Sequence, residues 1–501
     1  MITRTAGVVA LICASALVGA APALAAPDSD LARDLDAVLR DARLSGAAVD
    51  VVVRDAASGR VLYDRHGDGP VMPASNNKLN TAAAAFGLLG TGYRFRTTVS
   101  TAGGDLYLRG TGDTTMRAAD YDRLAGDVAD AGITEVRGDL VADDTWFDAD
   151  RVPDGWQSGD LQYAYAGRTS ALTVSPDADF DAGSIRVSVA ATRRGEPVRA
   201  SLSPATGTVR IDNRATTGRA GSPSTLEVNR DNGSDTIVIT GSHPEGAPES
   251  SVLRTVERPT LYAADVFRRA LRAHGVRVSG TTERGRAPAN ATTIATHTSM
   301  PLSRLARPFL KLSNNVMAEA LVKAIGRKER GRGTWTAGLP AVTGYLARLG
   351  VDTSQVTMTD GSGLARSNRT TATQLSTLLR SARRQPWFPA WYAALPVAGR
   401  PDRLIGGTLA NRMRGTAATG NVHAKTGTLT GVTALSGYVT GPGGRGLIFS
   451  SVFNRYSGAA PKDIEDAIAV RLAEGHATSR RRAAPSGTGD LEPTWARGMR
   501  P

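Results

Sequence analysis

A long β-rich stretch in the middle of this 501-residue chain constrains its fold more than any other feature. From about Phe95 to Ala289, short runs of Val, Ile and Thr alternate with Gly, Pro, Asn and Asp, which is typical of short strands joined by turns. One helix is predicted near the end of the stretch, from Pro259 to Ala273. The pattern therefore predicts a β-rich unit over residues 96–289.

The sequence on either side of this unit has an α/β pattern. Before it, Ala47 to Asp64 is predicted to form a β-hairpin, and Leu79 to Leu89 a helix that begins near Ser75. After it, helical periodicity returns at His297. The later helices and strands are expected at Val316–Ile325, Gly338–Leu349, Thr371–Arg380, Val422–Thr426, Thr433–Val439, Leu447–Phe453 and Pro461–Leu472. Because the front segment is short and the rear one long, we expect one α/β domain (26–95 and 290–475) split by an insertion.

The two ends of the chain carry different signals. A basic start, the apolar run Ala6–Val18 and the small residues Ala23-Leu24-Ala25 form the pattern of an export signal, residues 1–25. That run is too short to favour a spanning helix, and we expect no transmembrane segment after signal removal. The only cysteine, Cys13, lies in the signal, so the mature protein is expected to lack disulfides and thiol chemistry. Residues 476–501 are predicted to be a disordered tail.

The net charge of +13 does not indicate nucleic-acid binding. The chain contains 54 arginines and six lysines, and the arginines are spread through the chain, with no basic cluster that alternates with aromatic residues. A basic, soluble surface suits the anionic envelope into which an exported protein is delivered. We therefore expect an extracytoplasmic, envelope-associated protein with no nucleic-acid partner.

The first motif that carries chemistry is Ser75-x-x-Lys78, at the start of the predicted helix 79–89. Residues three apart share one face of a helix, so the Lys78 amine can reach the Ser75 hydroxyl. A lysine buried beside a hydroxyl can have its pKa lowered enough to accept the serine proton. The alternative is a helix-capping serine followed by a surface lysine. The scarcity of lysine in this chain favours the catalytic interpretation.

The second motif is Ser313-Asn314-Asn315, just before the predicted helix 316–325. In the functional interpretation, the Ser313 hydroxyl relays a proton and the Asn315 amide contacts a substrate amide. Ser and Asn are also common helix caps, so capping alone would explain this triplet equally well.

The third motif is Lys425-Thr426-Gly427, followed by Thr428, on the predicted strand 422–426. A strand edge with a glycine lets a substrate backbone approach closely. Lys425 would attract a carboxylate, Thr426 would hydrogen-bond it, and the Thr428 N–H would help to bind an oxyanion. The alternative is an ordinary strand end with a polar turn.

The three motifs in this order resemble the signature of penicillin-binding proteins and serine β-lactamases. The insertion between the first two motifs is similar to that of the D-alanyl-D-alanine carboxypeptidase/endopeptidases, the low-molecular-mass class C penicillin-binding proteins. Further segments carry the resemblance over about residues 30 to 474: Leu106-x-Leu108-x-Gly110-x-Gly112-Asp113, Gly138-Asp139-Leu140, Ser170-Ala171-Leu172, His297-Thr298-Ser299 and Asp360-Gly361-Ser362-Gly363-Leu364. The chain departs from the family at Thr114-Thr115 and Ala365, where Pro and Ser are common.

The resemblance implies a transpeptidase-like α/β domain with an antiparallel five-stranded sheet and an insert of two β-rich subdomains. Ser75 would be the acylated nucleophile and Lys78 its base, with no metal or cofactor. Ser313 and Asn315 would support proton transfer and orient the substrate, and Lys425 and Thr426 would bind the terminal carboxylate. Peptidoglycan stem peptides would be the substrates and β-lactam antibiotics the inhibitors. The N–H groups of Ser75 and Thr428 would form the oxyanion hole.

Two charged residues are candidates for recognising the stem-peptide side chain, which in many bacteria carries an amine and a carboxylate. Asp160 would face the amine and Arg366 the carboxylate, although single charged residues are most often simply solvated.

Two other classes of enzyme and a non-catalytic wall-binding module are the rival interpretations of the sequence. A serine β-lactamase usually lacks such an insert, and a Ser-His-Asp esterase would want a G-x-S-x-G turn, which this chain lacks.

Overall fold

The computed structural model describes residues 29–475. The predicted export signal, 1–25, and the predicted disordered tail, 476–501, lie outside the described residues. Within 29–475, every helix is either too short or too polar to cross a membrane.

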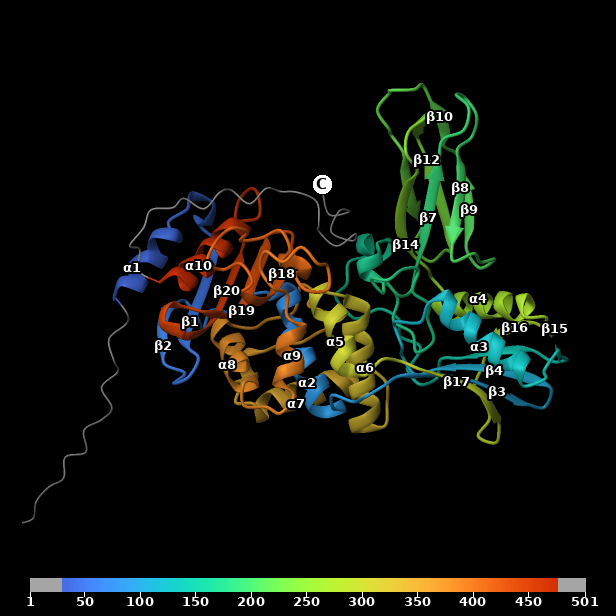
Figure 1. Ribbon diagram of the computed structural model, residues 1–501, viewed down its shortest axis with the longest axis horizontal. Helices are drawn as coiled ribbons and strands as arrows, with labels where there is room; N and C mark the ends of the chain where they lie inside the picture. Colours follow the sequence, from blue (N-terminus) through green and yellow to red (C-terminus); the bar gives the residue numbers. More distant parts are fainter. Residues whose placement is uncertain (1–28, 476–501) are drawn as a thin grey trace, which may run out of the picture.

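An antiparallel five-stranded sheet forms the centre of one half of the molecule, in the order β18-β19-β20-β1-β2 (Figure 1). Its strands are β1 (Ala48–Asp55), β2 (Val61–Arg65), β18 (His423–Leu429), β19 (Val432–Thr440) and β20 (Gly446–Asn454). The front and rear parts of the chain meet where β1 pairs with β20 over eight residues. The predicted antiparallel five-stranded sheet is confirmed.

Both faces of this sheet are covered, because successive side chains of a strand point to opposite faces. Leu447, Phe449 and Phe453 of β20 pack on one face with the helices at the two ends of the described chain, α1 (Ser29–Val38) and α10 (Lys462–Glu474). Ile448 and Val452 pack on the other face, against the remaining helices of this half. These helices are α2 (Asn77–Ala84), α5 (Leu302–Lys311), α6 (Asn315–Arg330), α7 (Trp335–Arg348), α8 (Ala372–Ala382) and α9 (Phe388–Ala394).

The middle of the chain builds the other half of the molecule around a separate core (Figure 1). A second five-stranded sheet, in the order β16-β6-β4-β3-β17, packs against two helices, α3 (Ala118–Asp130) and α4 (Pro259–Ala273). Its strands and the small pair beside it are β3 (Arg96–Ala102), β4 (Asp105–Gly110), β5 (Glu135–Val136), β6 (Leu140–Asp143), β15 (Arg277–Val278), β16 (Thr282–Arg284) and β17 (Thr292–Thr298). Helix α4 is predicted by the sequence to the residue, whereas α3 lies in a stretch predicted only as strands.

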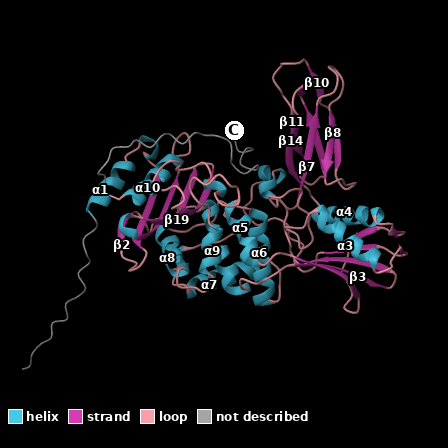
Figure 2. Cartoon of the chain, viewed as in Figure 1, coloured by secondary structure: helices cyan, strands magenta, loops and turns pink. Residues whose placement is uncertain are grey.

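A second group of strands projects from the molecule, as Figure 2 shows. It contains three small sheets, β14-β7-β8, β11-β12-β9 and β10-β13. The strands are β7 (Ser184–Ala190), β8 (Arg199–Ser203), β9 (Arg210–Asn213), β10 (Thr216–Gly218), β11 (Glu227–Arg230), β12 (Thr236–Thr240), β13 (Ser242–Pro244) and β14 (Ser250–Thr255). Ile185 and Val187, whose alternation predicts a strand, are buried in β7.

Candidate active site

Ser75 lies in a short 3-10 turn, Ala74–Asn76, that leads into α2. Lys78, one turn later, donates a hydrogen bond from Nζ to Ser75 Oγ at 2.9 Å. This contact follows from the spacing of three residues, which places both side chains on one face of the helix. Ser75 keeps part of its surface exposed while Lys78 is buried, so the hydroxyl is reachable and the amine is not.

The Ser75 turn is held from two sides by glycines that allow close approach. Ala74 adopts a positive φ of 45°, which an L-residue rarely does. A Cβ on Gly363 would lie 1.8 Å from the Ala74 carbonyl oxygen, and a Cβ on Gly427 would lie 3.2 Å from the Ser75 nitrogen. The strand that carries the third motif therefore passes directly beside the Ser75 backbone N–H.

Lys78 is enclosed by acceptors from three parts of the chain. Besides Ser75, its Nζ donates to Asn315 Oδ1 at 2.5 Å and to the Ser362 carbonyl oxygen at 2.8 Å. Burial lowers the pKa of Lys78 from its ordinary value to about 7, against the opposing charges of Asp360 and Glu319. An amine with this pKa is neutral in a large fraction of molecules at neutral pH and can accept a proton.

The second motif lies at the start of helix α6. One of its residues caps the helix, and the other two contact the lysines of the first and third motifs. Asn314 caps the helix, because its side chain accepts a hydrogen bond from Met317 N at 2.9 Å. Ser313 has a positive φ of 58° and its hydroxyl accepts from Lys425 Nζ at 2.8 Å. Asn315 contacts Lys78 through its oxygen, and its nitrogen donates to the Tyr165 carbonyl oxygen at 2.8 Å. Capping therefore explains Asn314, whereas Ser313 and Asn315 are the two residues of the triplet that contact the motif lysines.

Lys425 lies on β18 and is as deeply buried as Lys78. Its Nζ donates to Ser313 Oγ and, at 2.7 Å, to the Thr426 carbonyl oxygen. Burial lowers the pKa of Lys425 well below its ordinary value, and the charge of Lys78 lowers it further. The two lysines of the motifs thus each contact the second motif, Lys78 at Asn315 and Lys425 at Ser313.

The rest of the third motif continues along β18 beside the Ser75 turn. Thr426 Oγ1 donates to Thr408 Oγ1 at 2.7 Å. Gly427 pairs with Ala434 of β19, and Thr428 with Thr433. β18 is the edge strand of its sheet, and at its start Val397 bridges to His423 on the outer edge. Beyond that bridge no described strand pairs with this edge, so it can pair with an extended substrate.

The two candidates for side-chain recognition lie at the border of this group. Asp160, in the 3-10 segment Ser158–Gln162, is half-buried and accepts a hydrogen bond from Tyr165 Oη at 2.7 Å. Since the Tyr165 carbonyl oxygen accepts from Asn315, Asp160 is one residue removed from the second motif. Arg366 is half-buried and donates to the Thr430 carbonyl oxygen at 3.2 Å, at the end of the β18–β19 hairpin.

A segment of the inserted half completes the surroundings of the Ser75 turn. A small apolar cluster joins Ala74 to residues from the insert, from the loop after Gly363 and from the β18–β19 hairpin. Its members are Ala74, Trp156, Tyr165, Ala166, Leu364, Ala365, Leu429 and Val432. The Trp156 indole also donates to Asp360 Oδ2 at 2.8 Å. The insert is therefore part of the wall of the site.

Two buried carboxylates behind Lys78, those of Glu319 and Asp360, were missed as site residues in the sequence. Both side chains are completely buried. A signal for Glu319 was available: it is an acidic residue four positions after Asn315, on the same face of a helix that is otherwise apolar over residues 316–322. Asp360 starts a segment that carries the family resemblance, but only its position in the fold places it behind Lys78.

His423 lies on β18, two residues before Lys425. Its ring stacks on Tyr392 with centroids 4.3 Å apart. Burial, followed by the charge of Lys311, lowers the pKa of His423 to about 4. The imidazole is thus a packed, neutral ring in this structure.

Within the described residues, one group of three acidic side chains lies close enough to hold a metal ion: Asp177, Asp179 and Asp181. Asp177 is paired with Arg186, and Asp179 with Arg403. The group contains none of the motif residues, and the chemistry of the site needs none of its carboxylates.

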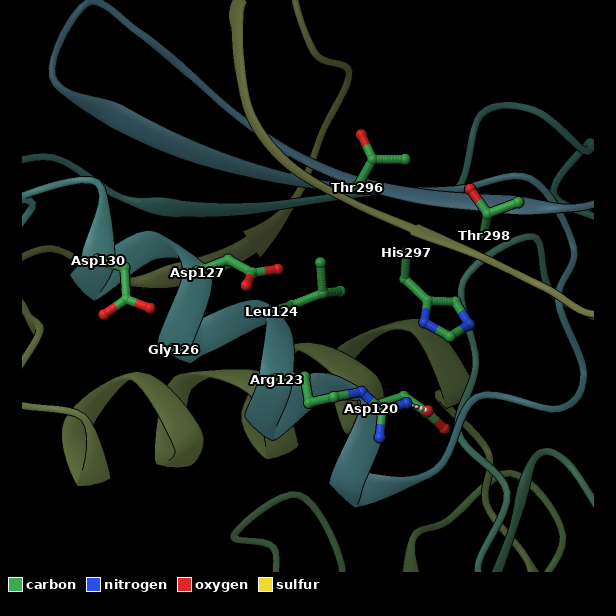
Figure 3. Close-up of a pocket in the computed structure, with 9 residues that line it drawn as sticks. All are labelled: Asp120, Arg123, Leu124, Gly126, Asp127, Asp130, Thr296, His297 and Thr298. Atoms are coloured by element: carbon green, nitrogen blue, oxygen red, sulfur yellow. Dashed lines mark hydrogen bonds and ion pairs between the residues drawn. The ribbon is translucent and has the colours of Figure 1, made fainter.

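A surface cavity of about 310 Å³ lies in the insert, between α3 and β17 (Figure 3). Asp127 and Asp130 lie at one end of it, and His297 and the ion-paired Asp120 and Arg123 at the other. None of the motif residues lines this cavity, so it is separate from the candidate active site.

The chain is similar to known proteins over most of its length. A family model described as the D-Ala-D-Ala carboxypeptidase 3 (S13) family matches residues 31–475. The D-alanyl-D-alanine carboxypeptidase of an Actinomadura species is 49% identical over 500 residues, which are 96% of this chain and 93% of that protein. Carboxypeptidase DacB of Mycolicibacterium smegmatis is 31% identical over 437 residues, 84% of this chain and 79% of that protein. The crystal structure of penicillin binding protein 4 from Haemophilus influenzae shares the fold, with a TM-score of 0.76 at 23% identity over 87% of this chain and 98% of that one.

Proposed function

This chain belongs to the D-Ala-D-Ala carboxypeptidase 3 (S13) family, and from that premise we propose the residues that carry its reaction. The protein is a serine-type D-Ala-D-Ala carboxypeptidase. Ser75 is the nucleophile, Lys78 its base, and Lys425 with Thr426 the site for the terminal carboxylate. The observation that supports this assignment best is the fully buried Lys78 Nζ, 2.9 Å from Ser75 Oγ and 2.5 Å from Asn315 Oδ1.

Acylation begins when neutral Lys78 takes the proton of Ser75 Oγ and the oxygen attacks the carbonyl carbon of the D-Ala-D-Ala amide. The negative charge on the carbonyl oxygen is stabilised by the backbone N–H groups of Ser75 and Thr428. The C–N bond then breaks, and the leaving amine of D-alanine takes a proton from the Ser313 hydroxyl, which accepts a hydrogen bond from Lys425. The proton that Lys78 took from Ser75 replaces it, so Lys78 is neutral again for the second half of the reaction. Ser75 is left as an ester of the shortened peptide.

Deacylation repeats these steps with water. A water molecule loses a proton to Lys78 and attacks the carbonyl carbon of the ester. The bond to Ser75 Oγ then breaks, and Lys78 returns the proton to that oxygen. A β-lactam would follow the acylation step but keep its leaving amine tethered to the acyl group. Its ester would therefore hydrolyse slowly, which makes such a compound a trap for Ser75.

The test is mass spectrometry of the intact protein after incubation with benzylpenicillin, followed by peptide mapping. We expect a gain of one penicillin mass on the peptide that contains Ser75, together with release of D-alanine from a D-Ala-D-Ala peptide. A protein that gains no mass would contradict the nucleophile assignment. Loss of the adduct within seconds would instead indicate a serine β-lactamase.

The two halves of the structure support a division of the chain into two domains. We assign residues 26–95 and 290–475 to a discontinuous catalytic domain and residues 96–289 to an insert with two subdomains. The separate hydrophobic cores of the two halves support this division. The substrate, a D-Ala-D-Ala bond of peptidoglycan, and the signal-like residues 1–25 support export to the cell envelope.

Asp160 and Arg366 are proposed to recognise the two charged groups of the stem-peptide side chain. An Asp160→Asn variant is expected to lose roughly tenfold in kcat/KM for a peptide with a free side-chain amine, because one charge-assisted contact is removed. The control is the same peptide with that amine acetylated, for which wild type and variant should be equal. Arg366→Gln should behave in the same way toward a free and an amidated side-chain carboxylate. Equal losses for both peptides of a pair would refute that residue's role.

A further inference from the structure

Glu319 on helix α6 is hydrogen-bonded to loop 360–363, the loop that contacts Lys78. Its Oε1 accepts a hydrogen bond from Ser362 N, and its Oε2 from Gly361 N, each at 2.9 Å. The Trp335 indole also donates to Oε2 at 2.8 Å. Both carboxylate oxygens of Glu319 thus accept hydrogen bonds from N–H groups. If Glu319 were protonated, the O–H of its carboxyl group would point at one of these N–H groups and would find no acceptor. Burial and the charge of Asp360 raise the pKa of Glu319 to about 7, and these N–H donors oppose that rise by stabilising the ionised form.

Asp360 begins the same loop and is just as fully engaged. Its Oδ1 accepts from Gly363 N at 2.7 Å and from Asn368 Nδ2 at 2.9 Å. Its Oδ2 accepts from Ala365 N at 2.7 Å and from the Trp156 indole at 2.8 Å. The loop 360–363 therefore wraps around one carboxylate and is fastened to α6 by another.

This loop touches the reacting groups at two points. The Ser362 carbonyl oxygen accepts from Lys78 Nζ, and Gly363 packs on the Ala74 carbonyl, next to the nucleophile. Ser362 thus contacts Lys78 through its oxygen and Glu319 through its nitrogen. One peptide residue separates the buried carboxylate from the catalytic amine.

We propose that Glu319 is a positioning residue of the reaction: it holds loop 360–363 against Lys78 and keeps a negative charge behind the amine. This inference rests on the proposed roles of Ser75 and Lys78 and adds a third group to them. Two carboxylates act on Lys78 from the elements around it, Asp360 in the loop and Glu319 on α6, while Lys425 on β18 has its own pKa lowered by burial and by the charge of Lys78. The two carboxylates favour the protonated amine, and burial opposes it.

Burial, Asp360 and Glu319 together decide the pH at which Lys78 becomes a base, so the charge of Glu319 contributes to it. Lys78 must be neutral to accept the Ser75 proton, so acylation rises with pH through the pKa of Lys78, which is about 7. Removing a nearby negative charge makes the ammonium less stable. The pKa of Lys78 then falls, and the rise in acylation moves to lower pH.

The experiment measures the rate constant of acylation by benzylpenicillin between about pH 5 and pH 9 in wild type and in Glu319→Gln. The variant is expected to have a lower maximal rate, because the loop is less firmly held. The midpoint of its rise is expected to lie about one pH unit below that of wild type. A purely structural defect would lower the rate without moving the midpoint in this direction.

Thr81→Val is the matched control. Thr81 Oγ1 donates to the Gly361 carbonyl oxygen at 2.6 Å, so this change loosens the same loop without altering a charge. Its midpoint should equal that of wild type. Should Glu319→Gln not fold, Asp360→Asn removes the other carboxylate charge and is expected to lower the midpoint in the same direction.

The inference is overturned if the midpoint of the folded charge-removing variant stays within about 0.3 pH units of wild type or rises, or if Thr81→Val lowers it equally. These outcomes are distinct from a failure of the proposed function, in which wild type itself would not be acylated at Ser75.

Discussion

Replacing Ser75 with alanine is expected to abolish covalent labelling by benzylpenicillin and to lower D-alanine release by roughly 10⁵-fold or more. The reason is that Ser75 Oγ is the hydroxyl oxygen that accepts a hydrogen bond from Lys78 Nζ at the start of α2, and alanine has no hydroxyl to be acylated. The measurement is intact-protein mass spectrometry beside an assay of released D-alanine.

The same variant should still bind a substrate carboxylate, because Lys425 and Thr426 are unchanged. Non-covalent binding of a D-Ala-D-Ala peptide, measured by calorimetry, is therefore expected to remain close to that of wild type. Ser58→Ala is the matched control, since Ser58 lies in the exposed turn between β1 and β2. If Ser75→Ala gained the penicillin mass, or if Ser58→Ala lost it, the nucleophile would have to be sought elsewhere.

Replacing Lys78 with methionine is expected to slow acylation by roughly 10⁴-fold, the upper range for a positioned general base. Methionine fills a similar volume but cannot accept the Ser75 proton or donate to Asn315 and Ser362. Stopped-flow measurement of benzylpenicillin acylation gives the rate. Lys328→Met removes an exposed lysine from α6 and should acylate as fast as wild type.

The same substitution has a stability signature whose sign follows from the pKa of Lys78. The pKa is about 7 in the folded protein and ordinarily 10.5. Below pH 7 the amine is charged in both states, and the full cost of burying the charge opposes folding. As pH rises from 7 toward 10.5, the folded state carries fewer protons than the unfolded state, and the wild type becomes more stable. This part of its stability is absent from Lys78→Met.

Thermal unfolding across this range therefore checks the burial of the charge. The melting temperature of Lys78→Met relative to wild type should be highest below about pH 7 and should fall steadily as the pH rises above it. Lys328→Met should show a constant difference from wild type over the same range. A constant difference for Lys78→Met would mean that Lys78 keeps an ordinary pKa in the folded protein.

Much of the fold followed from local patterns in the sequence. Alternating valines predicted β1, and the helix from Pro259 to Ala273 was predicted with the bounds it has in the structure. Three helices were not predicted: α1, α3 and α9. In α3, Tyr121, Leu124, Ala125 and Val128 are buried with helical spacing, but the acidic residues between them and the strand-rich surroundings hid the pattern. The strand-rich sequence around α3 was therefore misleading, whereas the residues of α3 themselves have the spacing of a helix.

The site divides along a similar line. The Ser75–Lys78 contact could be predicted from the sequence, because residues three apart on a helix lie on one face. The order of the three motifs, which indicates the family, is also visible in the sequence. Three contacts are known only from the folded chain: Lys425 donates to Ser313, Trp156 donates to Asp360, and Glu319 lies near Lys78. Such contacts join residues far apart in the chain, and the lowered pKa values of both lysines come from removing water around them. Desolvation is a property of the assembled interior, and no short stretch of sequence carries it.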